Sequence, residues 1–219
     1  MFRKVAPEEV NRKLLHGLVI ILPLGIFYVP LLFEFDRNAI AVLVFSLLLI
    51  SIFFELLRQR SVCFGEWFYA TFGSMLRVEE KKHLTGATYV AAATFFCAWM
   101  STISETMAAC SCLALTLFIL GDAVAALAGK SIGRIRIEKK TLEGAIGCFL
   151  LCLVLAYWVF PKLPRFLDAW GGELSLLHAI VIASSVAVLE LFPVKLGHLK
   201  LNDNLYVPVL VTIIAYTVC

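Results

Sequence analysis

Charged residues are scarce in this sequence. Only 16% of its 219 residues are Asp, Glu, Lys or Arg, while 61% are hydrophobic. A soluble domain is usually about one-quarter charged and about one-half apolar. The sequence also lacks long linkers, low-complexity runs and internal repeats, so we expect a single domain over residues 1–219. It has no basic domain outside its apolar runs, which excludes nucleic acid from the expected partners.

Apolar runs fill most of the chain. The hydrocarbon core of a bilayer is about 30 Å thick, and a helix needs about 20 apolar residues to cross it. The sequence therefore predicts an all-α, polytopic membrane protein with about seven transmembrane helices. The expected spans are residues 14–33, 39–57, 86–103, 107–128, 144–160, 175–193 and 205–218. The first run lacks an A-x-A-like cleavage site, so we expect a retained helix.

The segment "CFGEWFYATFGSML" (63–76) is aromatic and apolar, but Gly65, Glu66 and Gly73 interrupt it. It is too short to span a membrane. We expect either an interfacial or re-entrant helix, with its rings at headgroup level, or a surface loop.

The Lys and Arg residues favour one side of the expected bundle. Sixteen lie in the alternate segments 1–13, 58–85, 129–143 and 194–204, and three (Arg37, Lys162, Arg165) lie in the others. The positive-inside rule then predicts a cytoplasmic N-terminus, an outside C-terminus and basic loops that face the cytoplasm. Such a basic surface suits phosphate groups, whether of lipid headgroups or of a soluble nucleotide.

The stretch "GDAVAALAGKSIGRIRIEKKTLEG" (121–144) combines charge with glycine inside an apolar chain. Asp122 lies within an expected span, where a carboxylate is costly and is a candidate for function by default. The alternative is a structural ion pair with Lys130 or with a basic residue of another helix. Gly129 and Gly133 either pack closely against another helix or open the backbone toward a phosphate.

Further polar residues lie at the same membrane boundary. Asn202, Asp203 and Asn204 precede the last span, and their oxygens suit Mg²⁺, although Asn and Asp are also common in turns and caps. Glu190 is a third acid inside an apolar run, and it suits a ligand, a base or a helix-pairing residue. We expect Asp122, Asp203 and Glu190 to be catalytic, and Asp122, Asp203 and Asn204 to hold the metal.

Acids, basic residues and glycines at one boundary favour phosphoryl transfer, whose catalysis is mostly positioning and charge neutralisation. The sequence has no G-x-x-x-x-G-K-[ST] loop, so a nucleotide must be held in another way. A lipid hydroxyl at headgroup level and a nucleotide from the water would meet at this depth.

Five segments resemble one family: "RKLLHG" (12–17), "LRVEEKKHLTGATY" (76–89), "GDAVAALAGKSIG" (121–133), "KKTLEG" (139–144) and "LNDNLYVP" (201–208). In this order they are similar to CTP-dependent lipid kinases, which comprise dolichol kinase, the yeast-type diacylglycerol kinase and phytol kinase. The resemblance implies transfer of the CTP γ-phosphoryl group to the hydroxyl of a membrane lipid alcohol, with a divalent ion such as Mg²⁺. The acceptor stays open among diacylglycerol, polyprenol and phytol types.

The resemblance and the one-sided clustering together give an expected nucleotide and phosphate site. Its residues are His16, Lys82, Gly129, Lys130, Gly133, Arg134, Lys139, Lys140, Thr141, Glu143 and Gly144. We expect the site to face the cytoplasm, in a bacterial inner membrane or the endoplasmic reticulum.

Two alternatives remain. Phosphatidate cytidylyltransferase has a similar middle motif, but its C-terminal signature contains D-R-x-D-S, whereas this chain has "NDNLYVP" and lacks the second Asp and the Ser. This difference favours the kinase. A small-molecule transporter would place polar residues near the bilayer midplane and broken helices in paired halves, and the sequence has neither feature.

Overall fold

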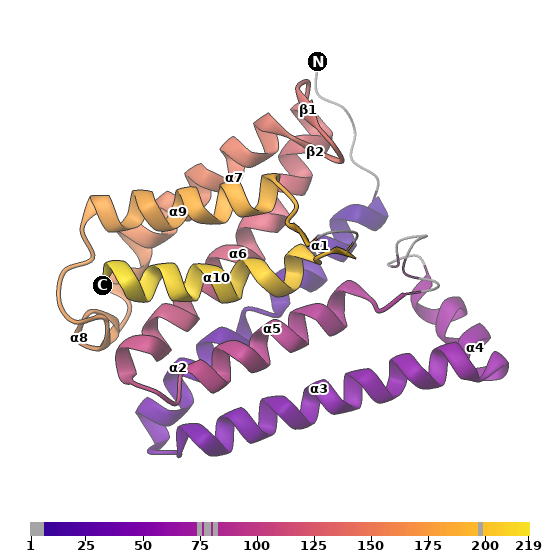
Figure 1. Ribbon diagram of the computed structural model, residues 1–219, viewed down its shortest axis with the longest axis horizontal. Helices are drawn as coiled ribbons and strands as arrows, with labels where there is room; N and C mark the ends of the chain where they lie inside the picture. The colour runs from indigo at the N-terminus through magenta and orange to yellow at the C-terminus, as the bar shows by residue number, and fades with distance from the viewer. Residues whose placement is uncertain (1–6, 74–75, 77–79, 81–82, 197–198) are drawn as a thin grey trace.

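The structure is a computed structural model that describes residues 7–73, 76, 80, 83–196 and 199–219. The chain forms a bundle of helices (Figure 1) with two very short hairpins, which confirms the expected all-α class. Lys82, one of the expected phosphate-binding residues, lies outside the described residues.

The first part of the chain forms four helices. They are α1 (Pro7–Leu18), α2 (Ile21–Phe33), α3 (Arg37–Arg60) and α4 (Val62–Phe72). Asp36 caps α3, because its carboxylate accepts the Asn38 backbone N–H at 3.1 Å. Ser61 caps α4 in the same way, accepting from Phe64 N–H at 3.3 Å. Most of the aromatic segment after α3 therefore forms a helix and not the alternative surface loop.

The middle of the chain holds the longest helix and the first hairpin. Its elements are α5 (Gly86–Met100), α6 (Glu105–Ile132), β1 (Arg136–Ile137), β2 (Lys140–Thr141) and α7 (Leu142–Val154), followed by a π-helical turn, η3 (Leu155–Val159), and a 3₁₀ turn, η4 (Phe160–Lys162). The antiparallel strands β1 and β2 pair Arg136 with Thr141 and Ile137 with Lys140. The sequence did not predict this hairpin.

The last part of the chain adds two apolar helices and a second hairpin. Its elements are α8 (Phe166–Trp170), α9 (Leu176–Leu191), β3 (Lys195–Leu196), β4 (Leu199–Lys200) and α10 (Asp203–Val218). The strands β3 and β4 are antiparallel. Neither α8 nor this hairpin was expected from the sequence.

Four helical segments within the described residues are long and apolar enough to cross a membrane. They are Glu9–Phe33, which joins α1 to α2, Arg37–Arg60, Glu105–Ile132 and Leu142–Lys162. The other three expected spans, α5, α9 and α10, are apolar helices of 15, 16 and 16 residues. At 1.5 Å per residue they are about 24 Å long. These lengths and compositions fit a membrane protein.

Helix α6 is the centre of the bundle. In its apolar window 72% of the residues are buried, against 22% in α3, and it packs against α1, α2, α5, α7, α8, α9 and α10. Gly121 permits the approach of α7, since a Cβ atom there would lie 2.8 Å from Cys148 Sγ. Asp122, the next residue along α6, is also buried, with 9% of its surface exposed.

Helix α3 has the opposite environment. A row of its large apolar side chains is exposed, comprising Val42, Leu43, Phe45, Leu47, Leu49, Ile50, Phe53, Phe54 and Leu56. Soluble monomers rarely expose a continuous apolar surface of this extent. This face is suited to contact with lipid.

The helices bring distant segments to one end of the bundle. Figure 1 shows α1, both hairpins, the end of α9 and the start of α10 close together, while α8 and the end of α10 lie at the opposite end. We call the first of these the hairpin end. It gathers the polar residues that the sequence places at the boundaries of its apolar runs.

Candidate functional site

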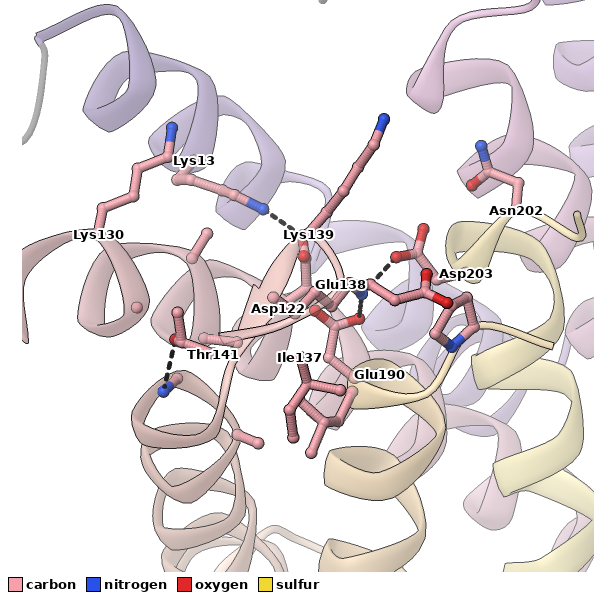
Figure 2. A pocket seen from close by; sticks show the side chains of 18 of the residues that line it. Lys13, Asp122, Lys130, Ile137, Glu138, Lys139, Thr141, Glu190, Asn202 and Asp203 are labelled. Atoms are coloured by element: carbon pink, nitrogen blue, oxygen red, sulfur yellow. Dashed lines mark hydrogen bonds and ion pairs between the residues drawn. The ribbon is translucent and has the colours of Figure 1, made fainter. Parts of the chain in front are cut away.

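A cavity of about 1010 Å³ opens at the hairpin end. Residues from α1, α6, the β1–β2 hairpin, α9 and α10 line it, and Figure 2 shows Lys13 directed toward Asp122, with Glu190 and Asp203 close by. We call it the polar cavity. Its lining includes the carboxylates of Asp122, Glu190 and Asp203, so the structure brings together the three expected catalytic acids.

Asp122 of α6 is held by α1. Lys13 Nζ donates a hydrogen bond to Asp122 Oδ2, and His16 Nε2 lies 3.5 Å from the same oxygen. Both partners face α6 because residues three apart lie on the same side of a helix. Lys13 and Asp122 are only 6% and 9% exposed. Sequence reasoning missed Lys13 as a site residue, although it stands in the "RKLLHG" segment.

Lys130 is not the partner of Asp122. Its ammonium group instead contacts Glu9 Oε2 at 2.9 Å, and Arg12 contacts Glu9 Oε1 at 2.6 Å. Lys130 still lines the polar cavity, with a side chain that is half exposed. The structure therefore assigns the ion pair of Asp122 to a basic residue of another helix, which was one of the expected alternatives.

Lys140 joins the other two acids. Its ammonium group donates to Glu190 Oε2 and, at 2.5 Å, to Asp203 Oδ2, as the dashed lines in Figure 2 show. The hairpin supplies the lysine, the end of α9 supplies Glu190, and the start of α10 supplies Asp203. Asn202 caps α10 by accepting the Asn204 backbone N–H at 3.0 Å, which fixes the direction of Asp203.

The surroundings of Lys140 keep it charged. Burial alone would lower the pKa of Lys140, but the carboxylates of Glu190 and Asp203 outweigh burial and raise the pKa above the ordinary 10.5. A raised pKa in the folded state contributes stability throughout the range below 10.5, and this contribution is lost only as the pH rises above it. The lysine thus carries its charge over the whole neutral range.

The glycines serve close packing. A Cβ atom at Gly129 would lie 2.5 Å from Thr141 Oγ1, and one at Gly144 would lie 2.5 Å from Ala125 O. Helix α6 continues through Ile132, and Gly133 N–H donates to Gly129 O at 3.1 Å. Of the two alternatives expected for Gly129 and Gly133, the structure shows the close packing, and Gly129 also lines the polar cavity. These residues let the hairpin and α7 lie directly on α6.

Two residues of the "KKTLEG" turn hold the hairpin in place. Glu143 accepts the backbone N–H groups of Arg134 at 2.9 Å and Ile135 at 3.2 Å. Thr141 Oγ1 accepts Gly144 N–H at 3.2 Å and so caps α7. Glu143 and Arg134 are thus tied to the base of the hairpin, whereas Lys139, Lys140 and Thr141 line the polar cavity.

A second cavity of about 480 Å³ adjoins the first. Its lining is mostly apolar and comes from the junction of α1 and α2, from α4 and from α5, and it includes His16 and Asn204. We call it the apolar cavity. Asp122 and Lys13 line both cavities, while Glu190 and Asp203 line the polar cavity.

Asp122, Glu190 and Asp203 are carboxylates of the polar cavity that could hold a divalent ion. Among the residues that the structure describes, no group of three or more His, Cys, Asp or Glu side chains is gathered at metal-binding spacing. Mg²⁺ usually keeps several waters and uses one or two carboxylates together with substrate phosphates. In the polar cavity, Asp203 supplies a carboxylate of this kind. Asn204 was expected to be a ligand, but its Nδ2 donates to Gly86 O at 3.5 Å.

A buried ion pair on α3 holds the residues that precede α5, among them Glu80, which lines both cavities. Glu55 and Arg58 pair with each other, and Arg58 donates to the backbone oxygens of Glu80 at 3.1 Å and His83 at 2.9 Å. Glu55 Oε1 accepts Thr85 N–H at 3.0 Å. The sequence carried a signal for this pair, since Glu55 is an acid inside an expected span.

Comparison with known proteins gives one relative without an assigned function. The chain is 25% identical over 203 residues to the uncharacterized protein RP860 of Rickettsia prowazekii (strain Madrid E). The alignment covers 91% of this chain and 89% of that protein. No protein-family model matches the chain. No solved structure matches it.

The variant Lys140→Met tests the ion-pair network. It leaves Glu190, which is 4% exposed, without its counter-charge. Removing one partner of a buried pair costs about 3 kcal/mol, so we expect clearly weaker thermal stability in detergent. The double variant Lys140→Met/Glu190→Gln should recover most of the loss. The control Lys139→Met alters the neighbouring exposed lysine and should unfold near the wild-type temperature. Equal stability of Lys140→Met and Lys139→Met would contradict the proposed role of the pair.

Proposed function

We propose that this protein is a CTP-dependent lipid kinase, which transfers the γ-phosphoryl group of CTP to the hydroxyl of a membrane lipid alcohol. The observation that carries the proposal is the polar cavity, where Asp122, Glu190 and Asp203 face Lys13 and Lys140. The resemblance of five sequence segments to this family supports it. The preference for CTP follows from that resemblance.

The side chains of the polar cavity suit phosphoryl transfer. This chemistry depends on positioning the reactants and on neutralising the charge of the transferred group. The ammonium groups of Lys13 and Lys140 would contact the phosphates, and Lys130 and Lys139 also line the cavity. Asp203 and Glu190 would hold Mg²⁺ together with the phosphates. When bound, the ion would supply positive charge to the phosphate oxygens.

The ion pairs of the polar cavity support the proposal that a nucleotide binds there. Lys13 and Lys140 are each paired with a carboxylate of the same cavity. A triphosphate would replace these carboxylates as the partner of the two lysines, and Glu190 and Asp203 would then become available to the divalent ion. The paired state thus keeps the buried charges compensated until the substrate arrives.

We also propose that seven helical segments cross the membrane, with the hairpin end in the cytoplasm. The seven are α1–α2, α3, α5, α6, α7 with its η turns, α9 and α10. The proposal is supported by the sixteen Lys and Arg residues in the segments of one side. It places the site where a cytoplasmic nucleotide and a membrane lipid meet.

Two native cysteines test this topology. Cys63 and Cys219 are exposed and belong to opposite ends of the bundle, whereas the other five cysteines are buried. In right-side-out vesicles a membrane-impermeant maleimide should label Cys219 and spare Cys63, and inside-out vesicles should give the reverse. The single variants Cys63→Ala and Cys219→Ala identify each signal. Labelling of both cysteines from one side would contradict an odd number of spans.

The kinase proposal is tested by following two labels. Purified protein is incubated with Mg²⁺ and with CTP labelled either on the γ-phosphate or on the α-phosphate, together with lipid alcohols or phosphatidate. We expect the γ label to move to an alcohol and CDP to be released. Transfer of the α label to phosphatidate, with release of pyrophosphate, would instead identify a cytidylyltransferase. Transfer of neither label would refute both enzymes.

A single variant and a double variant together test the role of Asp122. Asp122→Asn should reduce turnover by at least about a hundredfold, the scale of a lost acid–base group, but it also leaves Lys13 buried without its carboxylate. The double variant Lys13→Met/Asp122→Leu removes both charges, so it should restore thermal stability and stay inactive. Recovery of activity in the double variant would show that Asp122 serves the fold alone.

A further inference from the structure

The two cavities meet at four shared residues. Arg12, Lys13, Glu80 and Asp122 line both the polar and the apolar cavity, and Lys13 and Asp122 form a buried ion pair at this junction. On one side of this pair lie the remaining carboxylates and lysines of the polar cavity. On the other side the lining turns apolar within a few residues, beginning with Leu15 of α1. A ligand that reaches across the junction therefore needs a polar group at one end and an apolar body at the other.

The apolar cavity is built from three parts of the bundle. Leu15, Val19 and Leu22 come from α1, α2 and the turn between them, Phe68 and Phe72 from α4, and Ala87, Val90 and Ala91 from α5. The side chains of α5 are small, which leaves space between that helix and the aromatic rings of α4. Its volume of about 480 Å³ and its mostly apolar lining suit a hydrocarbon chain.

The apolar cavity also reaches the outside of the bundle. Leu15 and Phe72 line it, and they are 44% and 39% exposed. The same two helices carry further exposed apolar side chains, Leu14 and Leu18 on α1 and Trp67 on α4. An opening lined by apolar residues favours entry of an apolar ligand from a bilayer. A water-soluble ligand would gain little binding free energy at such an opening.

We propose that the apolar cavity binds the hydrocarbon tail of the acceptor lipid, and that Asp122 accepts the proton of its hydroxyl. The binding site follows from the cavity itself, while the proton transfer rests on the proposed kinase function. This assignment divides the three acids. Asp122 faces the acceptor, and Glu190 and Asp203, which both pair with Lys140, face the nucleotide.

The proposed step transfers one phosphoryl group and one proton. The hydroxyl oxygen forms a bond to the γ-phosphorus, and the bond between this phosphorus and the β–γ bridging oxygen breaks. CDP leaves with the electron pair, and the hydroxyl proton passes to Asp122. Lys13 stays beside the transferred group, where its charge offsets that of the phosphate oxygens.

A photoactivatable lipid tests the binding site. The probe is a long-chain primary alcohol with a diazirine in its tail, added to the purified full-length protein in detergent, and the labelled peptides are identified by mass spectrometry. We expect labels on α4 and α5 at Phe68, Phe72, Ala87 or Ala91, and protection by an excess of diacylglycerol, polyprenol or phytol. The matching alkane without a hydroxyl should label the cavity less.

Two leucine substitutions on α5 give a matched comparison. Ala91 and Ala92 are both half-buried, but only Ala91 is part of the cavity lining. Ala91→Leu should lower labelling and raise the KM for the lipid by at least about fivefold, because the larger side chain fills the cavity. Ala92→Leu should change neither value. Binding of CTP, measured separately, should be the same in both variants.

Several outcomes would overturn the inference. Labels confined to other helices, or equal losses in Ala91→Leu and Ala92→Leu, would exclude this cavity as the tail site. If CTP alone, without any competing lipid, prevented labelling by the probe, the occupant of the cavity would be the cytosine ring. Labelling in the cavity without γ-phosphoryl transfer to any alcohol would support the binding site and refute the kinase. Transfer with labels elsewhere would support the kinase and refute the site.

Discussion

The ion pair between Lys13 and Asp122 is the constraint on which the site depends. A carboxylate in the interior of an apolar bundle is tolerated only when an opposite charge satisfies it. The ion pair therefore holds α1 against α6 at the level of Asp122. The network of Lys140 with Glu190 and Asp203 does the same for the first hairpin, α9 and α10. These two sets of ion pairs hold five separate segments at one site: α1, α6, the first hairpin, α9 and α10.

Close backbone packing makes these contacts possible. The first hairpin reaches over the end of α6 only because Gly129 and Gly133 leave room for Thr141. The same approach brings Lys140 to the two acids. Glu143 and the capping Thr141 then fix the hairpin to α7. The glycines of the 121–144 stretch therefore act on the site indirectly, by setting the distance between the elements that carry its charges.

The sequence predicted the helices and the acids more successfully than their contacts. Each expected apolar run is a helix, since a long run without charge has few other solutions in an apolar solvent. Asp122, Glu190 and Asp203 stood out because each interrupts or borders such a run. Lys13 did not stand out, since a lysine in a basic N-terminal arm is ordinary. The two-residue strands were equally hidden, because they depend on packing against α6 and not on local propensity.

The charges of the polar cavity come from almost the full length of the chain. Lys13 belongs to the first helix and Asp203 to the last, with Asp122, Lys140 and Glu190 between them. No shorter fragment retains the whole arrangement, and any cut that removes α1 or α10 strands a charge whose partner has gone. Loss of α1 would leave the buried Asp122 without Lys13, and loss of α10 would remove one of the two acids that hold Lys140, so both ends of the chain contribute to the same charged cluster.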